Sequence, residues 1–480
     1  MTSGAKPLGT YARNFGAMFV LPSLARGAVL VLQLFAAWML DLDEYAVFAV
    51  AASFCAVSYA LFDFGMGTVS IRDLARNGDA PLDRLASWLG CKLLIAGTGM
   101  LACGAVALLV FGLTRQAAAV GLLLPAYVAF SIVELLRTPF RAHDRMAVDT
   151  SFLVFDRVVA AGLSLAAMAI WRDVLAGCAA FSAGAVLASG GTFAALRRSF
   201  GVPRVLHPFA ALRKRWTTLW PVGTFLVLVM IGNRAHVIIV ERMTGTEEAA
   251  VFAAGFSLLY VLQMASYAFR ETLYPTMSRL SESDMDRSKA LLRKACRLAL
   301  LASVPIALAG YAAREIVIGL IYPDRLSAAA DVLGIVVLSF AMTSVTNLLV
   351  GFLRSAGTDR PVLFVSIGDF LLLFTLGIWL IRRDGAVGAA WTLLATEAWR
   401  LLFIGAVSAW RFRLYPAPAT ALRFAASVAA GVAGLILLPS TRPYARALAA
   451  FAMPLAAFSV LGGFSRDDIR LLFRLFPSKG

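Results

Sequence analysis

Asn233, Arg234 and His236 stand inside an otherwise apolar stretch that runs through residues 219–240. A planar guanidinium donates two parallel hydrogen bonds to phosphate or carboxylate oxygens, so an arginine here can bind an anion. At the centre of a membrane helix an arginine costs about 2.5–3.5 kcal/mol on insertion scales, and something must offset that cost. Either an anionic ligand or a structural carboxylate could compensate this cost, and both possibilities stay open. Because helical spacing puts His236 on another face, the candidate is Arg234, with Asn233 as a secondary one.

Arg26 is a second cation deep in an apolar stretch, one turn after Pro22, where a proline can kink a helix. Side chains lean toward the helix N-terminus, so both Arg26 and Arg234 should reach back toward the start of their helices. We predict that they are substrate-binding cations facing a common cavity, with Arg270 and Arg400 as secondary candidates. Four cations lie within reach of a helix end, where snorkelling toward that end explains them, and Arg270 is among them. They are Lys92, Arg157, Arg270 and Arg297.

Three carboxylates also fall inside apolar stretches: Asp156, Asp369 and Glu397. A carboxylate within a membrane span can carry a coupling proton or cation. It can equally neutralise an arginine, and Asp156 is followed directly by Arg157. Both interpretations stay open for all three residues.

The composition indicates which elements must position these residues. Hydrophobic residues make up 60% of the 480 and charged ones 15%, whereas soluble domains are nearer half and a quarter. The formal net charge of +16 does not indicate a nucleic-acid partner, because the basic residues form short clusters between apolar runs. The five cysteines form no C-x-x-C pair, so neither a metal site nor a disulfide framework is predicted. The chain is expected to be an all-α, polytopic membrane protein whose first span is not cleaved.

Fourteen stretches are long and apolar enough to cross a membrane. They are 16–40, 45–70, 86–112, 117–138, 149–171, 174–196, 217–240, 247–272, 292–313, 328–353, 361–381, 386–410, 420–439 and 445–464. Taken alternately, the intervening loops place twenty-eight basic residues on one side and nine on the other. Since basic loops lie on the cytoplasmic side, both termini are predicted to be cytoplasmic.

An internal repeat indicates two lobes of six spans each. Glu44 and Glu248 begin the similar segments EYAVFAVA and EAAVFAAG, and Cys91 and Cys296 begin CKL and CRL. With two later landmarks the offsets are 204, 205, 213 and 211, and Asp156 and Asp369 are counterparts. We therefore predict an N-terminal lobe over residues 1–200, a cytoplasmic linker over 201–216, a C-terminal lobe over 217–413, and two further spans with a tail over 414–480. Parallel repeats around a cavity are typical of alternating-access transporters.

Motifs of enzyme chemistry are missing from the sequence. We find no Walker A, H-E-x-x-H or G-x-S-x-G motif, no cofactor motif, and no loop of more than about two dozen residues. The chain is therefore not expected to be an enzyme or to need a cofactor. A polytopic glycosyltransferase or ligase is the enzyme-class alternative, and a duplicated membrane scaffold would have no evident need for deep charges.

Three segments carry a resemblance to a known family: YAVFAVAASFCAVSYALFDFGMGTVSIRDLAR (residues 45–76), VLGIVVLSFAMTSVTNLLVGFLRSAGTDR (332–360) and GAVGAAWTLLATEAWR (385–400). They resemble the Wzx-type flippases of lipid-linked polysaccharides, which belong to the MOP superfamily with the lipid II flippase and the MATE exporters. The resemblance implies translocation of an undecaprenyl-pyrophosphate-linked oligosaccharide across the bacterial inner membrane, with membrane lipid and a polysaccharide polymerase as further partners. It implies that Arg26 and Arg234 are cavity cations. A MATE-like small-molecule exporter is the alternative, although deep carboxylates rather than deep cations would suit its cationic substrates.

Overall fold

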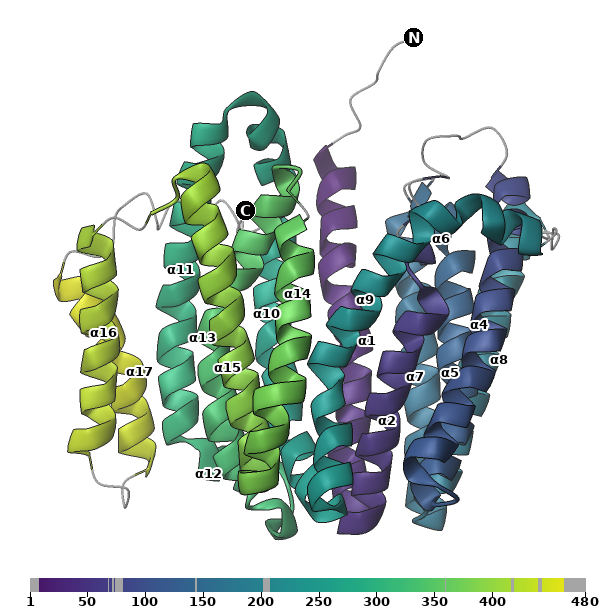
Figure 1. The fold of residues 1–480 in the computed structure, drawn as a ribbon, viewed down its shortest axis with the longest axis horizontal. Coiled ribbons are helices and arrows are strands. Elements are labelled where there is room, and N and C mark those ends of the chain that lie inside the picture. Colours follow the sequence, from purple (N-terminus) through teal and green to yellow (C-terminus); the bar gives the residue numbers. More distant parts are fainter. Residues whose placement is uncertain are drawn as a thin grey trace. The chain divides into compact units, whose positions relative to one another are not determined.

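The computed structural model describes residues 8–67, 69–70, 73, 81–142, 145–201, 208–358, 360–415, 418–438 and 443–461. Within these ranges every regular element is a helix, and eleven helices are long and apolar enough to cross a membrane (Figure 1). The expected all-α, polytopic membrane protein is confirmed. Backbone groups in lipid must pair within their own segment, which is why a chain this apolar forms long helices.

The fourteen predicted spans all fall on apolar helices. One candidate, Arg360–Phe412, holds both the eleventh and the twelfth predicted span, and Gly385 breaks it with a φ of 56°. Glycine adopts a positive φ at no steric cost, so the chain turns at Gly385 and one helix follows directly on the other. Two shorter apolar helices, Leu24–Met39 and Leu422–Leu437, match the first and thirteenth predicted spans.

Contacts divide the chain into two compact units, Met1–Ala250 and Val251–Gly480. The boundary follows the seventh predicted span because this helix packs on two helices of the first unit, α2 and α4. The predicted lobes, which put that span in the second half, rest on the sequence repeat. The lobe boundaries therefore stay a prediction about the repeat.

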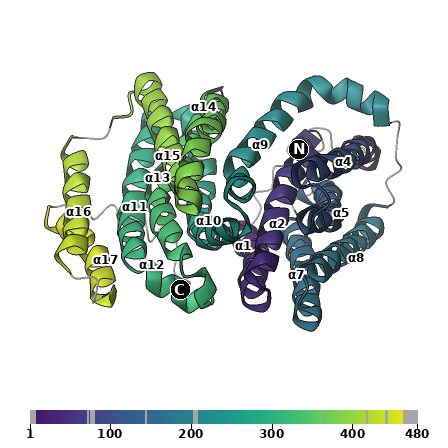
Figure 2. The same ribbon diagram turned by 60° about the horizontal axis from the view of Figure 1, so that its bottom comes forward.

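The first unit contains eight helices in its described residues: α1 (Leu8–Met39), α2 (Leu42–Asp63), α4 (Pro81–Phe111), α5 (Arg115–Leu136), α6 (Thr138–Ala142), α7 (Met146–Trp171), α8 (Val174–Phe200) and α9 (Pro208–Thr244). Helix α8 packs along both α7 and α5, and α1 also packs on α7 (Figure 2). Gly184 lets α8 approach α7 closely, since a Cβ there would lie 2.9 Å from the Cα of Ala160. Small residues at such crossings are the usual device of membrane helix packing.

The second unit begins within α10 (Thr246–Ser283) and continues with α11 (Met285–Ala312), α12 (Arg314–Ile321), α13 (Ala329–Ser355), α14 (Arg360–Leu372), a π-helical turn (Leu373–Gly377), α15 (Ile378–Phe412), α16 (Pro418–Leu437) and α17 (Pro443–Val460). Helix α13 packs on both α11 and α15, and α16 pairs with α17 beside α11 (Figure 1). The π turn follows Asp369 by one helical turn, and such turns often occur at functional sites.

Helix ends in the first unit follow local chemistry. Helix α2 stops at Asp63 because Phe64 and Gly65 take left-handed conformations, with φ of 40° and 78°. The predicted span, which ran on to residue 70, is therefore interrupted at Phe64 and Gly65, and the chain is helical again from Met66. Helix α8 starts at Asp173, whose carboxylate accepts a hydrogen bond from the backbone N–H of Ala176. An aspartate at this position satisfies one of the unpaired N–H groups of a helix start.

Candidate functional site

Arg234 is half-buried on α9, beside the half-buried Asn233. Tyr127 of α5 lies within direct electrostatic range of Arg234 and also of Arg157. His236, two residues further on, is buried at 1% exposure, as expected of a packed histidine on another face.

Arg26 lies on α1 and is exposed, and no described carboxylate forms an ion pair with it. Helix α1 packs on α7, whereas α9 packs on α2 and α4. The expectation that Arg26 and Arg234 face one another across a cavity stays a prediction.

Arg157 on α7 is the cation that sequence reasoning missed. Its guanidinium carbon lies 3.5 Å from the ring centroid of Phe130 on α5. Tyr59 and Tyr127 are both within its electrostatic range. The side chain of Arg157 thus packs on an aromatic ring of the neighbouring helix, and its interpretation as a residue that snorkels to a helix end stays a prediction. A cation–π contact contributes about 0.5–2 kcal/mol, which does not match the about 2.5–3.5 kcal/mol that a central arginine costs.

Glu134 near the end of α5 and Asp149 near the start of α7 both pair with Arg141 of α6. Glu134 accepts a hydrogen bond from the Tyr59 hydroxyl and lies 3.6 Å from the guanidinium of Arg141. Arg141 in turn donates to Asp149 at 2.9 Å. These bonds connect α5 with α2 and α6, and α6 with α7.

Asp156, the direct neighbour of Arg157, points to a different helix. It is 2% exposed and accepts a hydrogen bond from the Thr192 hydroxyl of α8 at 3.5 Å. Successive residues of an α-helix lie about 100° apart, so Asp156 and Arg157 face different neighbours. The five residues Tyr59, Tyr127, Phe130, Arg157 and Arg234 are called the Arg157 cluster below.

The interpretation of Lys92 on α4 as a residue that snorkels to a helix end was wrong. It is fully buried, and its ammonium lies 2.7 Å from a carboxylate oxygen of Asp63 on α2. This buried ion pair connects α4 with the end of α2. Lys92 is therefore an internal ion-pair residue of the first unit.

In the second unit Arg400 is held by two carboxylates. Its Nε lies 2.8 Å from Asp369 on α14, and a terminal nitrogen lies 2.6 Å from Glu397 one turn earlier on α15. Asp369 and Glu397 are 3% and 4% exposed. The other oxygen of each, Asp369 Oδ1 and Glu397 Oε2, has no hydrogen-bond partner among the described residues. These three residues, called the Arg400 triad below, carry a net charge of −1 when all are ionised.

Arg270, the other secondary candidate, lies on α10 in the second unit. It pairs with the adjacent Glu271 through two hydrogen bonds, one of 3.1 Å from its Nε, and lies 5.2 Å from the ring of Tyr267. Both secondary arginines are thus ion-paired within their own unit.

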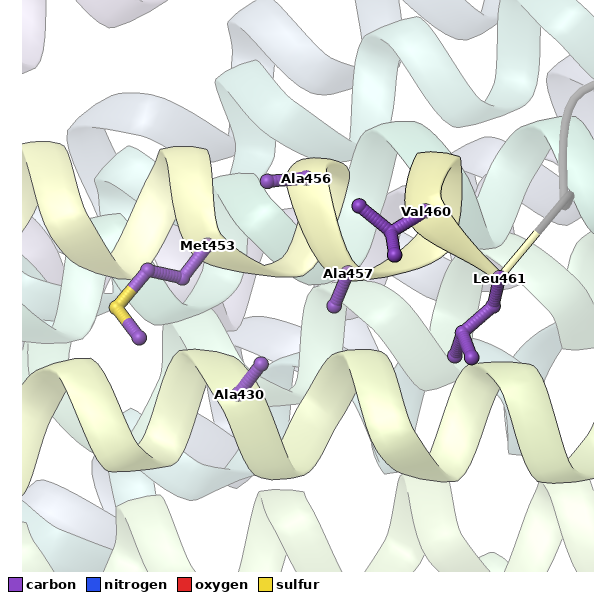
Figure 3. Close-up of a pocket in the computed structure, with 6 residues that line it drawn as sticks. All are labelled: Ala430, Met453, Ala456, Ala457, Val460 and Leu461. Atoms are coloured by element: carbon purple, nitrogen blue, oxygen red, sulfur yellow. The ribbon is translucent and has the colours of Figure 1, made fainter.

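The apolar pocket between α16 and α17 has different chemistry. It has a volume of about 420 Å³ and is lined by Ala430, Met453, Ala456, Ala457, Val460 and Leu461. Figure 3 shows Ala430 on one helix facing Met453, Ala457 and Leu461 of the other. No charged side chain lines it, so this pocket holds none of the candidate residues.

The family model for polysaccharide biosynthesis proteins matches residues 11–281, which is more than half of the chain. The chain belongs to this family. A second model, MatE, matches residues 221–379 of this polysaccharide biosynthesis protein. No curated protein matches the sequence.

Solved structures of transporters share the fold of this polysaccharide biosynthesis protein. The lipid II flippase MurJ in an inward closed conformation is similar with a TM-score of 0.73 at 11% identity, covering 94% of this chain and 99% of that one. The MATE multidrug transporter DinF-BH gives 0.60 at 14% identity, covering 86% and 97%. A MOP superfamily transporter from Pyrococcus furiosus, described by a reverse polarity of its binding pocket, gives 0.56 at 12% identity, covering 84% and 95%. The family match confirms the predicted resemblance at the level of the family, and the solved structures show that the chain shares their fold.

Proposed function

We propose that this protein moves an undecaprenyl-pyrophosphate-linked oligosaccharide from the cytoplasmic to the periplasmic leaflet of the bacterial inner membrane. The glycan would serve a surface polysaccharide such as O-antigen, capsule or exopolysaccharide. The observation that carries the proposal is the polysaccharide biosynthesis family match, whose range includes both Arg26 and Arg234. Lipid and the lipid-linked glycan are the partners, and a polysaccharide polymerase is the expected next protein.

The chemistry of the intramembrane residues supports an anionic substrate. A diphosphate carries several oxygens in fixed positions, and arginine binds such oxygens through two parallel donors. In a low-dielectric cavity this attraction is much stronger than in water. The prenyl tail needs no polar partner and stays in the lipid. Parallel lobes of spans 1–6 and 7–12, with both termini in the cytoplasm, would open alternately to the two leaflets.

The Arg400 triad supports a coupling ion in the second unit. Asp369 and Glu397 each keep a buried oxygen without a hydrogen-bond partner among the described residues, and their negative charge exceeds the positive charge of Arg400. A proton or a sodium ion at these oxygens would balance the triad. Asp156 in the first unit, whose carboxylate accepts a hydrogen bond from the Thr192 hydroxyl, is the second candidate for such coupling.

Export of glycan by Arg234 variants tests the proposal. In cells whose own copy is deleted, Arg234→Ala should lower surface polysaccharide at least about tenfold, because a charge-assisted contact to phosphate is lost. Arg234→Lys keeps the charge but not the fork, so it should retain part of the export. Surface glycan is measured by gel and by lectin binding, and membrane levels of each variant are measured by immunoblot.

Arg242→Ala, which changes a basic residue at the far end of the same helix, is the matched control and should export normally. Full export by an Arg234→Ala protein that reaches normal membrane levels would contradict the proposal.

A MATE-like exporter of small cations is the second candidate function. The MatE model matches residues 221–379, a range that includes Asp369, and buried carboxylates suit a cationic substrate. This alternative predicts that the chain raises resistance to cationic dyes in a pump-deficient host. The flippase proposal predicts no such resistance and a loss of surface glycan when the gene is deleted.

A further inference from the structure

The start of α9 presents a row of exposed aromatic side chains. Phe209, Trp216 and Trp220 are 73%, 47% and 50% exposed. Arg213, which lies between them in the sequence, is exposed as well. The four residues follow one another at spacings of four, three and four, so they lie on one face of the helix. This face, called the aromatic face of α9 below, has the composition of a surface that contacts a partner or a membrane.

A different side of the same segment is fixed to the first unit. A terminal nitrogen of Arg215 donates a hydrogen bond of 2.6 Å to the Ser87 hydroxyl of α4. The guanidinium carbon of Arg215 also lies 4.3 Å from the ring centroid of Trp88. Trp216 stacks on Phe64, which follows α2, at a centroid distance of 5.7 Å. These contacts hold the aromatic face in a fixed direction on the first unit.

The start of α9 has the position of a helix at a membrane surface. Residues 208–216 belong to the predicted cytoplasmic linker, and the span candidate within α9 begins at Leu219. Figure 1 shows the start of α9 crossing one end of the first unit before the helix turns and runs beside α2. Pro221 lies inside α9, where a proline allows such a turn. A tryptophan at the start of a span is a common interfacial anchor, because its ring has an apolar body and a polar N–H.

The charge around the aromatic face has one sign. Six basic residues and no carboxylate lie within residues 197–216. Arg197 and Arg198, in the last turn of α8, are exposed. Phe200 at the end of α8 packs on the same apolar cluster as Leu212 of α9, so both basic segments lie at one end of the first unit. An anionic surface is therefore complementary to both segments.

We propose that the aromatic face of α9 and the exposed arginines at the end of α8 bind anionic phospholipid headgroups at the membrane surface. The aromatic rings enter the interfacial layer of the bilayer, and the guanidinium groups of Arg197, Arg198 and Arg213 bind lipid phosphates. Arg215 stays packed on Trp88, so the bound lipid fixes the start of α9 against α4. This inference goes beyond the proposed function, because it holds whichever molecule the protein moves.

Tryptophan emission of the full-length protein in nanodiscs tests the lipid site. The nanodiscs consist of phosphatidylcholine with an increasing mole fraction of phosphatidylglycerol whose acyl chains carry bromine, a short-range quencher of tryptophan. Brominated phosphatidylcholine measures the unselective contact. Brominated phosphatidylglycerol should quench the wild-type protein at a lower mole fraction than brominated phosphatidylcholine does. In Arg213→Gln the mole fraction of brominated phosphatidylglycerol for half-maximal quenching should rise about fivefold at low salt, and less at high salt.

Two controls locate the contact on α9. The double variant Trp216→Phe, Trp220→Phe keeps aromatic rings at both positions but removes the reporters, so the selective part of the quenching should be lost. Trp410→Phe is the matched control, because Trp410 in the second unit is 83% exposed, and it should leave the selective part unchanged. Arg293→Gln, at an exposed arginine of α11, is the charge control and should not shift the half-maximal mole fraction.

The outcomes that would overturn the inference do not depend on a folding defect. Equal quenching of the wild-type protein by the two brominated lipids would do so, and would leave a protein partner as the occupant of the aromatic face. An unchanged half-maximal mole fraction in Arg213→Gln would also do so, because Arg213 is exposed and its replacement should leave the fold intact. Selective quenching that persists in the double tryptophan variant would place the lipid on another part of the protein and contradict the site on α9.

Discussion

Asp156 and Asp369 occupy matching places in the sequence repeat, yet the two units surround them with different chemistry. In the first unit Asp156 takes a hydroxyl from Thr192, and the adjacent Arg157 lies on an aromatic ring of α5. In the second unit Phe370 follows Asp369 instead, and Asp369 shares Arg400 with Glu397. The arginine of the first unit thus packs on an aromatic ring, whereas the arginine of the second unit pairs with two carboxylates, each of which keeps one oxygen without a hydrogen-bond partner among the described residues.

This difference suggests a division of labour between repeats that began alike. A cation held by aromatic rings attracts an anionic substrate, and two carboxylates around one arginine attract a small cation. A transporter that couples an anion to a cation needs both kinds of site in one chain. Duplication followed by exchange of a few buried side chains would supply them without a change of fold.

Removing the arginine from each unit should have the largest and the most unequal effect. Arg400→Met leaves two buried carboxylates without their cation, which should destabilise the protein by about 3–5 kcal/mol. Arg157→Met removes a charge that no described carboxylate balances, so the fold should persist while export is lost. Thermal unfolding of the purified proteins in detergent checks the first effect, and surface glycan checks the second. Equal losses of stability in the two variants would show that both arginines are structural.

The helices of both units could be predicted from apolar length, whereas their orientation in the membrane, predicted from the loop charges, stays a prediction. The end of α2 could not, because Phe64 is a good membrane residue and only its left-handed conformation beside Gly65 stops the helix. Backbone conformation of this kind depends on neighbours that hydropathy does not describe.

The sequence predicts which charged residues are candidates better than it predicts which side chains they contact. Arg234 is conspicuous because the whole stretch around it is apolar. Arg157 is eight residues into the predicted span 149–171, about 12 Å from its start, and Tyr127 is eleven residues from the end of 117–138, about 16 Å. The two predicted spans run in opposite directions, so these similar distances place Arg157 and Tyr127 at a similar depth. That was the sequence signal that the two residues could lie near one another. That α5 presents Phe130 to Arg157 follows from packing, which one sequence does not reveal.

The second largest effect should come from neutralising the matching aspartates, and it should differ between the two units. Asp369→Asn removes a charge from the Arg400 triad and should lower ion-driven transport about 10- to 100-fold, the range for a charge-assisted contact. Asp156→Asn keeps an oxygen that can accept the hydrogen bond from Thr192, so transport should change less than about threefold. Flipping in proteoliposomes with an imposed sodium or proton gradient measures both. A larger loss in Asp156→Asn would reverse the assignment of ion coupling to the second unit.

The smallest effect should come from the hydroxyl that faces Asp156. Thr192→Val is nearly isosteric and removes the donor at 3.5 Å, a long hydrogen bond, so it should destabilise the protein by about 0.5–1 kcal/mol. Thr396→Val on α15 is the matched variant in the second unit, because the Thr396 hydroxyl donates to the backbone carbonyl of Thr392 in its own helix. Its loss should leave the Arg400 triad intact and change the unfolding temperature less. If Thr396→Val instead alters the ion dependence of transport, that hydroxyl is a ligand of the coupled ion, and the second site is wider than the two carboxylates.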